Sequence, residues 1–182
     1  MTKKKKEQIK TLDILWKNTL NLIGAAKLLL TSDQKVSYAF VLLQICSEEM
    51  GRIYALYLYF TEHKSVEKPP KDNHIDKHVY FTKFMSFQPV GRRSYFEIMS
   101  AITGFNITKT NINKMKTLQK IQNYKEMNLY VTIRSAEHRA TAQPLKMGLS
   151  KKKKLIVELL ELQEIYMHSM LYKLIRQYEN KS

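Results

Sequence analysis

The sequence predicts an all-α protein folded as an up-and-down helical bundle of about five to six helices. Two observations lead to this prediction: apolar residues recur at helical spacing over most of the chain, and polar segments with Pro or Gly separate these stretches. A length of 182 residues suits one domain over 1–182 with its own hydrophobic core. Because Cys46 is the single cysteine, no internal disulfide can form, and a reducing, cytoplasmic location is expected.

Two helices are expected in the first third of the chain. Residues 5–30 form an amphipathic helix behind a disordered basic tail at 1–5, with apolar positions such as Ile9, Leu12 and Trp16 on one face. Turn and N-cap residues at 31–33 then lead into a helix over 36–60. This second helix is apolar on nearly every face except a central polar cluster, so it belongs inside the bundle.

The next helices are delimited by proline, glycine and capping residues. Pro69 and Pro70 end a polar loop, and Asp72 is a suitable N-cap for a third helix that extends to about residue 87. Ser94 then begins a short element that extends to about residue 102.

The last third of the chain combines helix with an irregular segment. Residues 114–125 have helical spacing, whereas the β-branched stretch 129–133 favours a short extended piece within an irregular segment near 126–149. Ser150 can cap a final helix through about residue 178.

Charge suggests a polyanionic partner. The chain has 31 Lys and Arg against 16 Asp and Glu, a net charge of +15, which suits nucleic acid or an anionic membrane face, although a lysine-rich surface alone gives the same excess. Residues 36–60 could span a bilayer by length, but the charges in their middle argue for a soluble protein without a membrane partner. A nucleic-acid contact is expected at the start of the last helix, at Lys151, Lys152, Lys153 and Lys154.

The central cluster of the second helix is the most informative local feature. Arg52 lies four residues after Glu48 and three after Glu49, so it can pair with either carboxylate. Gly51 costs about 1 kcal/mol relative to Ala inside a helix, which indicates close helix packing or a ligand near the backbone. The cluster is therefore either an internal ion pair that fixes helix register or part of a functional site.

A second group of polar residues opens the third helix. His74 and His78 are one turn apart, as two metal ligands would be, but no HExxH pattern or nearby cysteine supports a metal site. With Lys77 beside it, His74 could act as a general acid or base while the lysine holds a phosphate. The alternative is a solvated helix start.

A third polar group includes Arg134 and His138. Together they could cleave RNA without a metal, as base and phosphate-stabilising cation, or they could simply belong to an exposed loop. The chain has no Walker A loop, GxGxxG or GxSxG, so NTPase, Rossmann-type dehydrogenase and α/β-hydrolase functions lack their motifs.

In this order the motifs resemble those of the AbiV family of abortive-infection proteins, which belongs to the HEPN superfamily. The residues 48–52, EEMGR, are similar to the family's EELGK, residues 74–77 to its HxxK, and residues 125–131, KEMNLYV, to its K…GLYV. Three positions depart from that pattern: Arg52 replaces the usual Lys, Asn128 the usual Gly, and Thr132 the Asp that often follows the YV pair. Only three residues separate Arg134 from His138, fewer than in the usual HEPN ribonuclease signature.

The resemblance implies an antiphage HEPN-type effector that dimerises and acts as a metal-independent endoribonuclease to block translation or growth. The expected partners are RNA, a second copy of the chain, and a phage or host regulatory protein, with no cofactor or metal. The alternative is a non-catalytic helical module that binds RNA or protein. The candidate catalytic residues are Glu49 to orient a cation, Arg52 and Lys77 to stabilise phosphate charge and His74 as acid or base, with Glu48, Tyr130, Arg134 and His138 as secondary candidates.

Overall fold

The computed structural model describes residues 1–63, 68–70, 73–85, 91–112, 114–130 and 148–180. These residues contain helices and no strand, which confirms the predicted all-α bundle. The helices are α1 (Lys3–Leu29), α2 (Val36–Phe60), α3 (His74–Phe84), α4 (Tyr95–Thr103), α5 (Met115–Tyr130), α6 (Leu149–Ile165), a π-helical segment (Tyr166–Leu171) and α7 (Tyr172–Asn180).

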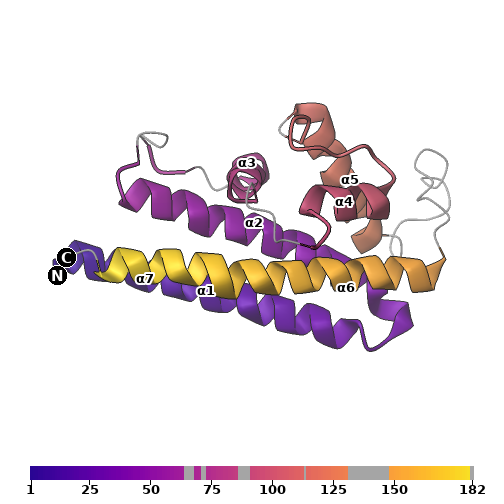
Figure 1. Cartoon of the computed structure of the whole chain (residues 1–182), viewed down its shortest axis with the longest axis horizontal. Coiled ribbons are helices and arrows are strands. Elements are labelled where there is room, and N and C mark those ends of the chain that lie inside the picture. The colour runs from indigo at the N-terminus through magenta and orange to yellow at the C-terminus, as the bar shows by residue number, and fades with distance from the viewer. Residues whose placement is uncertain (64–67, 71–72, 86–90, 113, 131–147, 181–182) are drawn as a thin grey trace.

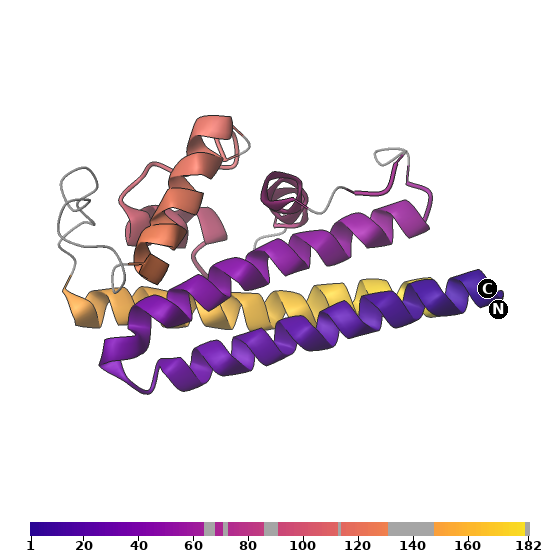
Figure 2. The same ribbon diagram turned by 180° about the vertical axis from the view of Figure 1, so that it is seen from behind.

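Three long rods form the body of the molecule. Helix α1, helix α2 and the continuous rod of α6 and α7 run lengthwise beside one another (Figure 1). Helices α3, α4 and α5 lie on the side of α2 that faces away from α1, and α3 crosses α2 instead of running along it (Figure 2). The two ends of the chain lie together, where the Tyr178 hydroxyl donates to Gln8 Oε1 at 2.7 Å.

Helix α2 is the centre of the bundle. Its bounds agree with the sequence prediction because its apolar residues can be covered on all sides, by α1, α3, α5 and α6. Its buried polar groups are bonded to neighbouring helices. The Gln163 Nε2 of α6 donates to the Leu43 carbonyl at 2.7 Å and to Ser47 Oγ at 2.9 Å. These bonds fix α6 against α2 without leaving the donors unsatisfied.

The first helix starts earlier than predicted. The Thr2 side chain accepts a hydrogen bond from the Lys5 backbone N–H at 3.2 Å, which caps the helix at its N-terminus. Lys3, Lys4 and Lys5 therefore form its first turn, and the prediction of a disordered tail at 1–5 is wrong for these residues.

Two other helix starts also differ from the prediction. Asn73, not Asp72, caps α3: its Oδ1 accepts from the Asp76 N–H at 2.8 Å, while residue 72 lies outside the described residues. Gly148 rather than Ser150 precedes the first turn of α6. The predicted start of α4 is confirmed, because Ser94 and Glu97 form a reciprocal capping box.

Helix α5 extends further than the sequence suggested. Residues 129 and 130, expected in an extended piece, belong to the last turn of α5, so local β-propensity is overridden there. The rest of that expected extended piece, and residues 131–147 of the irregular segment, lie outside the described residues.

Gly51 is the point of closest approach between α2 and α3. A Cβ built on Gly51 would lie 1.9 Å from the Lys77 carbonyl oxygen and 2.8 Å from the Phe81 backbone nitrogen. Both atoms belong to the α3 backbone, so no side-chain rotation can make room. Close packing of α2 against α3 thus explains why a glycine stands at position 51 despite its cost to helix stability.

We expect Gly51→Ala to lower the free energy of unfolding by about 1–3 kcal/mol, because α3 must move to accommodate one methyl group. Gly24→Ala is the matched control: it lies in α1, and its added Cβ meets nothing within 4 Å. Gly24→Ala should raise the free energy of unfolding by about 1 kcal/mol. Urea unfolding of both variants measures the difference, and equal stability of Gly51→Ala and wild type would contradict the packing account.

Candidate functional site

Glu48 is a buried carboxylate in the middle of α2. Its side chain is 4% exposed, and three basic side chains surround it. Lys125 Nζ of α5 donates to Oε1 at 2.8 Å, and His78 Nε2 of α3 lies 3.5 Å from the same oxygen. The other oxygen, Oε2, is 2.6 Å from Nδ1 of His74. Each carboxylate oxygen therefore has a partner, as a buried charge requires.

The ionised form of Glu48 is strongly favoured. Burial by itself would raise the pKa of this carboxyl group, but hydrogen bonds from His78 and Lys125 and the charges of these groups outweigh it and lower the pKa from 4.5 to about 2. Glu48 is thus an anion at any physiological pH. It can accept hydrogen bonds but cannot itself supply a proton.

His74 is the exposed end of this cluster. Its side chain is 61% exposed, although its Nδ1 is bonded to a carboxylate that is almost fully buried. A carboxylate acceptor at Nδ1 favours the tautomer that carries its proton there, which leaves the Nε2 lone pair available for proton transfer. The pair has the arrangement that a general base and its orienting carboxylate require.

Glu49 binds a second, separate set of cations. Lys77 Nζ of α3 donates to Glu49 Oε1 at 3.1 Å, and Arg52 Nη1 lies 3.5 Å from Oε2. Adjacent residues on a helix point about 100° apart, so Glu48 and Glu49 serve different neighbours. Glu49 fixes the directions of Arg52 and Lys77 without burying either charge completely, because their side chains are 36% and 13% exposed.

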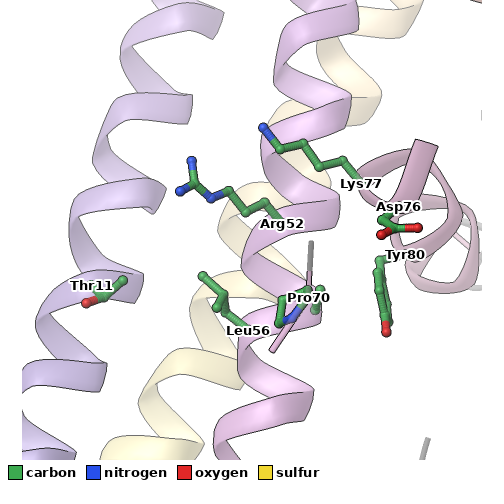
Figure 3. A pocket seen from close by; sticks show the side chains of 8 residues that line it. Thr11, Arg52, Leu56, Pro70, Asp76, Lys77 and Tyr80 are labelled. Carbon is green, nitrogen blue, oxygen red and sulfur yellow. The ribbon is translucent and has the colours of Figure 1, made fainter. Parts of the chain in front are cut away.

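Arg52 and Lys77 lie at the edge of a pocket of about 200 Å³ between α1, α2 and α3 (Figure 3). The pocket combines cationic, aromatic, acidic and apolar groups. It is lined by Thr11, Arg52, Ala55, Leu56, Pro70, Asp76, Lys77 and Tyr80. An exposed histidine one helical turn before Lys77 and two cations beside a pocket form a site suited to a phosphate-containing ligand.

The structure brings three of the four candidate catalytic residues into contact, because Arg52 and Lys77 both pair with Glu49. The fourth, His74, lies one helical turn before Lys77 on α3 and contacts Glu48 instead. Glu48, only a secondary candidate, holds His74 directly. Of the other secondary candidates, Tyr130 ends α5, but its side chain is outside the described residues, as are Arg134 and His138 entirely.

Sequence reasoning missed two members of the site, His78 and Lys125. His78 was considered only as a metal ligand, although its spacing from His74 places both rings on the face of α3 that meets α2. Lys125 opens the segment that resembles the family's K…GLYV motif, and this was the one signal that could have identified it. Its partner is 77 residues away, so only the fold reveals the contact.

The four lysines proposed for nucleic-acid binding have unequal surroundings. Lys152 Nζ donates to Ser37 Oγ at 3.0 Å, and burial lowers the pKa of Lys152. Lys153 Nζ contacts Asp33 Oδ1 at 2.6 Å. These two side chains hold the start of α6 against the turn between α1 and α2, whereas Lys151 and Lys154 are exposed.

Two kinds of site are not found in the part of the chain that the structure describes. No group of three or more His, Cys, Asp or Glu residues there could hold a metal ion. No described helix is long and apolar enough to cross a membrane.

The all-α bundle of the described helices is consistent with the HEPN class of proteins. The family model for AbiV matches residues 9–162, and the chain belongs to this HEPN family of abortive-infection proteins. Comparisons with curated proteins and with solved structures gave no match.

We expect Glu48→Gln to destabilise the protein at neutral pH by about 3–5 kcal/mol, because Lys125 and His78 would lose their counter-charge. Since the folded pKa of Glu48 is below its ordinary value, its stabilisation is present above pH 4.5 and is lost as pH falls towards about 2. Urea unfolding between pH 7 and pH 2 should therefore show a steeper acid loss in wild type than in Glu48→Gln.

Glu161→Gln is the matched control for this measurement. Glu161 pairs with Arg92 at 2.8 Å on the surface, where both side chains are about half exposed. Its loss should change stability by at most about 1 kcal/mol. Equal effects of the two substitutions would contradict the role assigned to Glu48.

Proposed function

We propose that this AbiV-family protein is a metal-independent endoribonuclease of antiphage defence, whose cleavage of RNA blocks translation or growth. The observation that carries the proposal is the exposed His74, bonded through Nδ1 to the buried carboxylate of Glu48. The arrangement pairs a proton-transfer group with a permanent anion, and Lys77, one helical turn after His74, and Arg52 supply two cations that can bind a phosphate.

The chemistry follows from these positions. Nε2 of His74 removes the proton from a ribose 2′-hydroxyl, and the 2′-oxygen attacks the adjacent phosphorus. The bond from phosphorus to the 5′-oxygen breaks, that oxygen takes a proton from solvent, and the products are a 2′,3′-cyclic phosphate and a 5′-hydroxyl. Glu48 stabilises the imidazolium that forms, while Lys77 and Arg52 stabilise the charge that develops on the phosphate oxygens.

Two further features support RNA as the substrate and a second copy of the chain as a partner. The net charge of +15 favours a polyanion, and Lys151 and Lys154 offer exposed contacts for its backbone. Helix α1 exposes Ile14 by 48% and Leu28 by 73%. These residues are four turns apart on one face of α1, which favours a homodimer through this face.

We expect purified wild-type protein to cut total cellular RNA in EDTA and to leave 2′,3′-cyclic phosphate ends. His74→Ala should reduce the rate about 10²–10⁴-fold, the usual contribution of a general base. Gel analysis of the fragments and end-group analysis measure both effects.

His168→Ala is the control for this experiment. His168 is exposed and packs edge-on against Trp16, on the rod formed by α6 and α7 and away from the site. The His168→Ala variant should cleave RNA at the wild-type rate. RNA that stays intact with wild type, both alone and with extract of phage-infected cells, would contradict the nuclease and favour the alternative of a non-catalytic module that binds RNA or protein.

A further inference from the structure

The pocket beside Arg52 and Lys77 has two chemically different sides (Figure 3). Arg52 projects from α2 towards α1, and Lys77 extends from α3 across α2, so both cationic groups lie on the side of the pocket away from α3. Asp76 and Tyr80 lie on α3 at the other side, with Pro70 between them and α2. A ligand that fills this pocket should therefore carry a negative group at one end and a flat, hydrogen-bonding group at the other.

Asp76 and Tyr80 form a pair on one face of α3. They are four residues apart, so their side chains neighbour each other along the helix. Within the part of the chain that the structure describes, the Asp76 carboxylate accepts one hydrogen bond, on Oδ2 from Asn73 Nδ2 at 3.0 Å. This bond fixes its orientation and leaves Oδ1 to accept from a ligand. Lys83 Nζ lies 5.0 Å from the centroid of the Tyr80 ring and holds the ring in place.

A carboxylate beside an aromatic ring distinguishes the four RNA bases. Guanine presents two adjacent N–H groups, N1–H and the 2-amino group, which can donate to both oxygens of one carboxylate. Adenine and cytosine place an unprotonated ring nitrogen beside their amino group, and uracil flanks its N–H with carbonyl oxygens, so each opposes a carboxylate with a lone pair. Stacking on the ring is available to every base, whereas the paired hydrogen bonds are available to guanine alone.

We propose that this pocket is a guanosine subsite for the RNA strand, in which Asp76 binds N1–H and the 2-amino group, Tyr80 stacks on the base, and Arg52 and Lys77 bind an adjoining phosphate. The inference rests on the proposed function and adds base specificity to it. Asp76 and Tyr80 are specificity-determining residues here, distinct from the proton-transfer pair of His74 and Glu48.

The test is a binding titration of full-length wild-type protein with 5′-GMP, 5′-IMP and 5′-AMP. Inosine monophosphate keeps N1–H but lacks the 2-amino group. We expect GMP to bind at least about tenfold more tightly than AMP, because a bidentate contact gives discrimination of this size. IMP should have an intermediate affinity because it can donate only one of the two hydrogen bonds. Asp76→Asn should abolish the preference for GMP and leave AMP binding unchanged. Asp33→Asn, at an exposed aspartate that pairs with Lys153, is the matched control and should behave like wild type.

The aromatic contribution is tested separately at Tyr80. Tyr80→Phe should retain binding of GMP, whereas Tyr80→Leu should weaken it at least about fivefold, in line with the usual effect of removing a stacking ring. Equal affinity for GMP and AMP, or a GMP preference that survives Asp76→Asn, would overturn the proposal.

An oligouridylate with one guanosine, or with one inosine in its place, distinguishes RNA from free nucleotide. Tighter binding of the guanosine oligomer supports a subsite for RNA, whereas binding of GMP without any effect of guanosine in the oligomer overturns it. This result is separable from the nuclease test. Cleavage without guanine preference removes only the subsite, and guanine preference without cleavage removes only the nuclease.

Discussion

A fully charged carboxylate in the middle of the central helix constrains the rest of the structure. Glu48 cannot be buried in α2 unless basic groups reach it, and its partners come from α3 and α5. Helix α3 must therefore lie against α2 at this level, and α5 must place Lys125 there too. Gly51, one turn along, lets the α3 backbone approach closely enough for these contacts. The fold and the site thus depend on the same few residues.

The two neighbouring carboxylates of α2 contact different groups of the candidate site. Glu48 is buried in the bundle and orients an exposed histidine, while Glu49 pairs with Arg52 and Lys77, two residues that line the pocket. Both carboxylates stand on a long, well-packed helix, and three of their partners, His74, Lys77 and His78, stand on α3, whose backbone packs against Gly51. Such rigid support would keep the acid–base group and the phosphate-binding cations of the proposed nuclease in position.

Local chemistry made much of the fold predictable. The bounds of α2 followed from its long apolar segment, and the start of α4 followed from Ser94, whose capping box with Glu97 the structure shows. The paired charges of α2 and the importance of Gly51 were also visible in the sequence. What spacing could not show was which carboxylate meets which cation. Arg52 is near both in sequence and is bound to Glu49, whereas Glu48 takes partners from helices 26 to 77 residues away. Long-range contacts of this kind are decided by helix packing, not by local pattern.

The proposed activity depends on Glu48 orienting His74 for proton transfer at Nε2. Long-range ¹H–¹⁵N correlation spectra of the histidine rings test it directly, because they identify which ring nitrogen carries the proton in the neutral form. We expect neutral His74 to have its proton on Nδ1 in wild type and to lose this preference in Glu48→Gln, where the carboxylate is gone. A proton on Nε2 in the wild-type protein, or an unchanged tautomer in Glu48→Gln, would contradict the account.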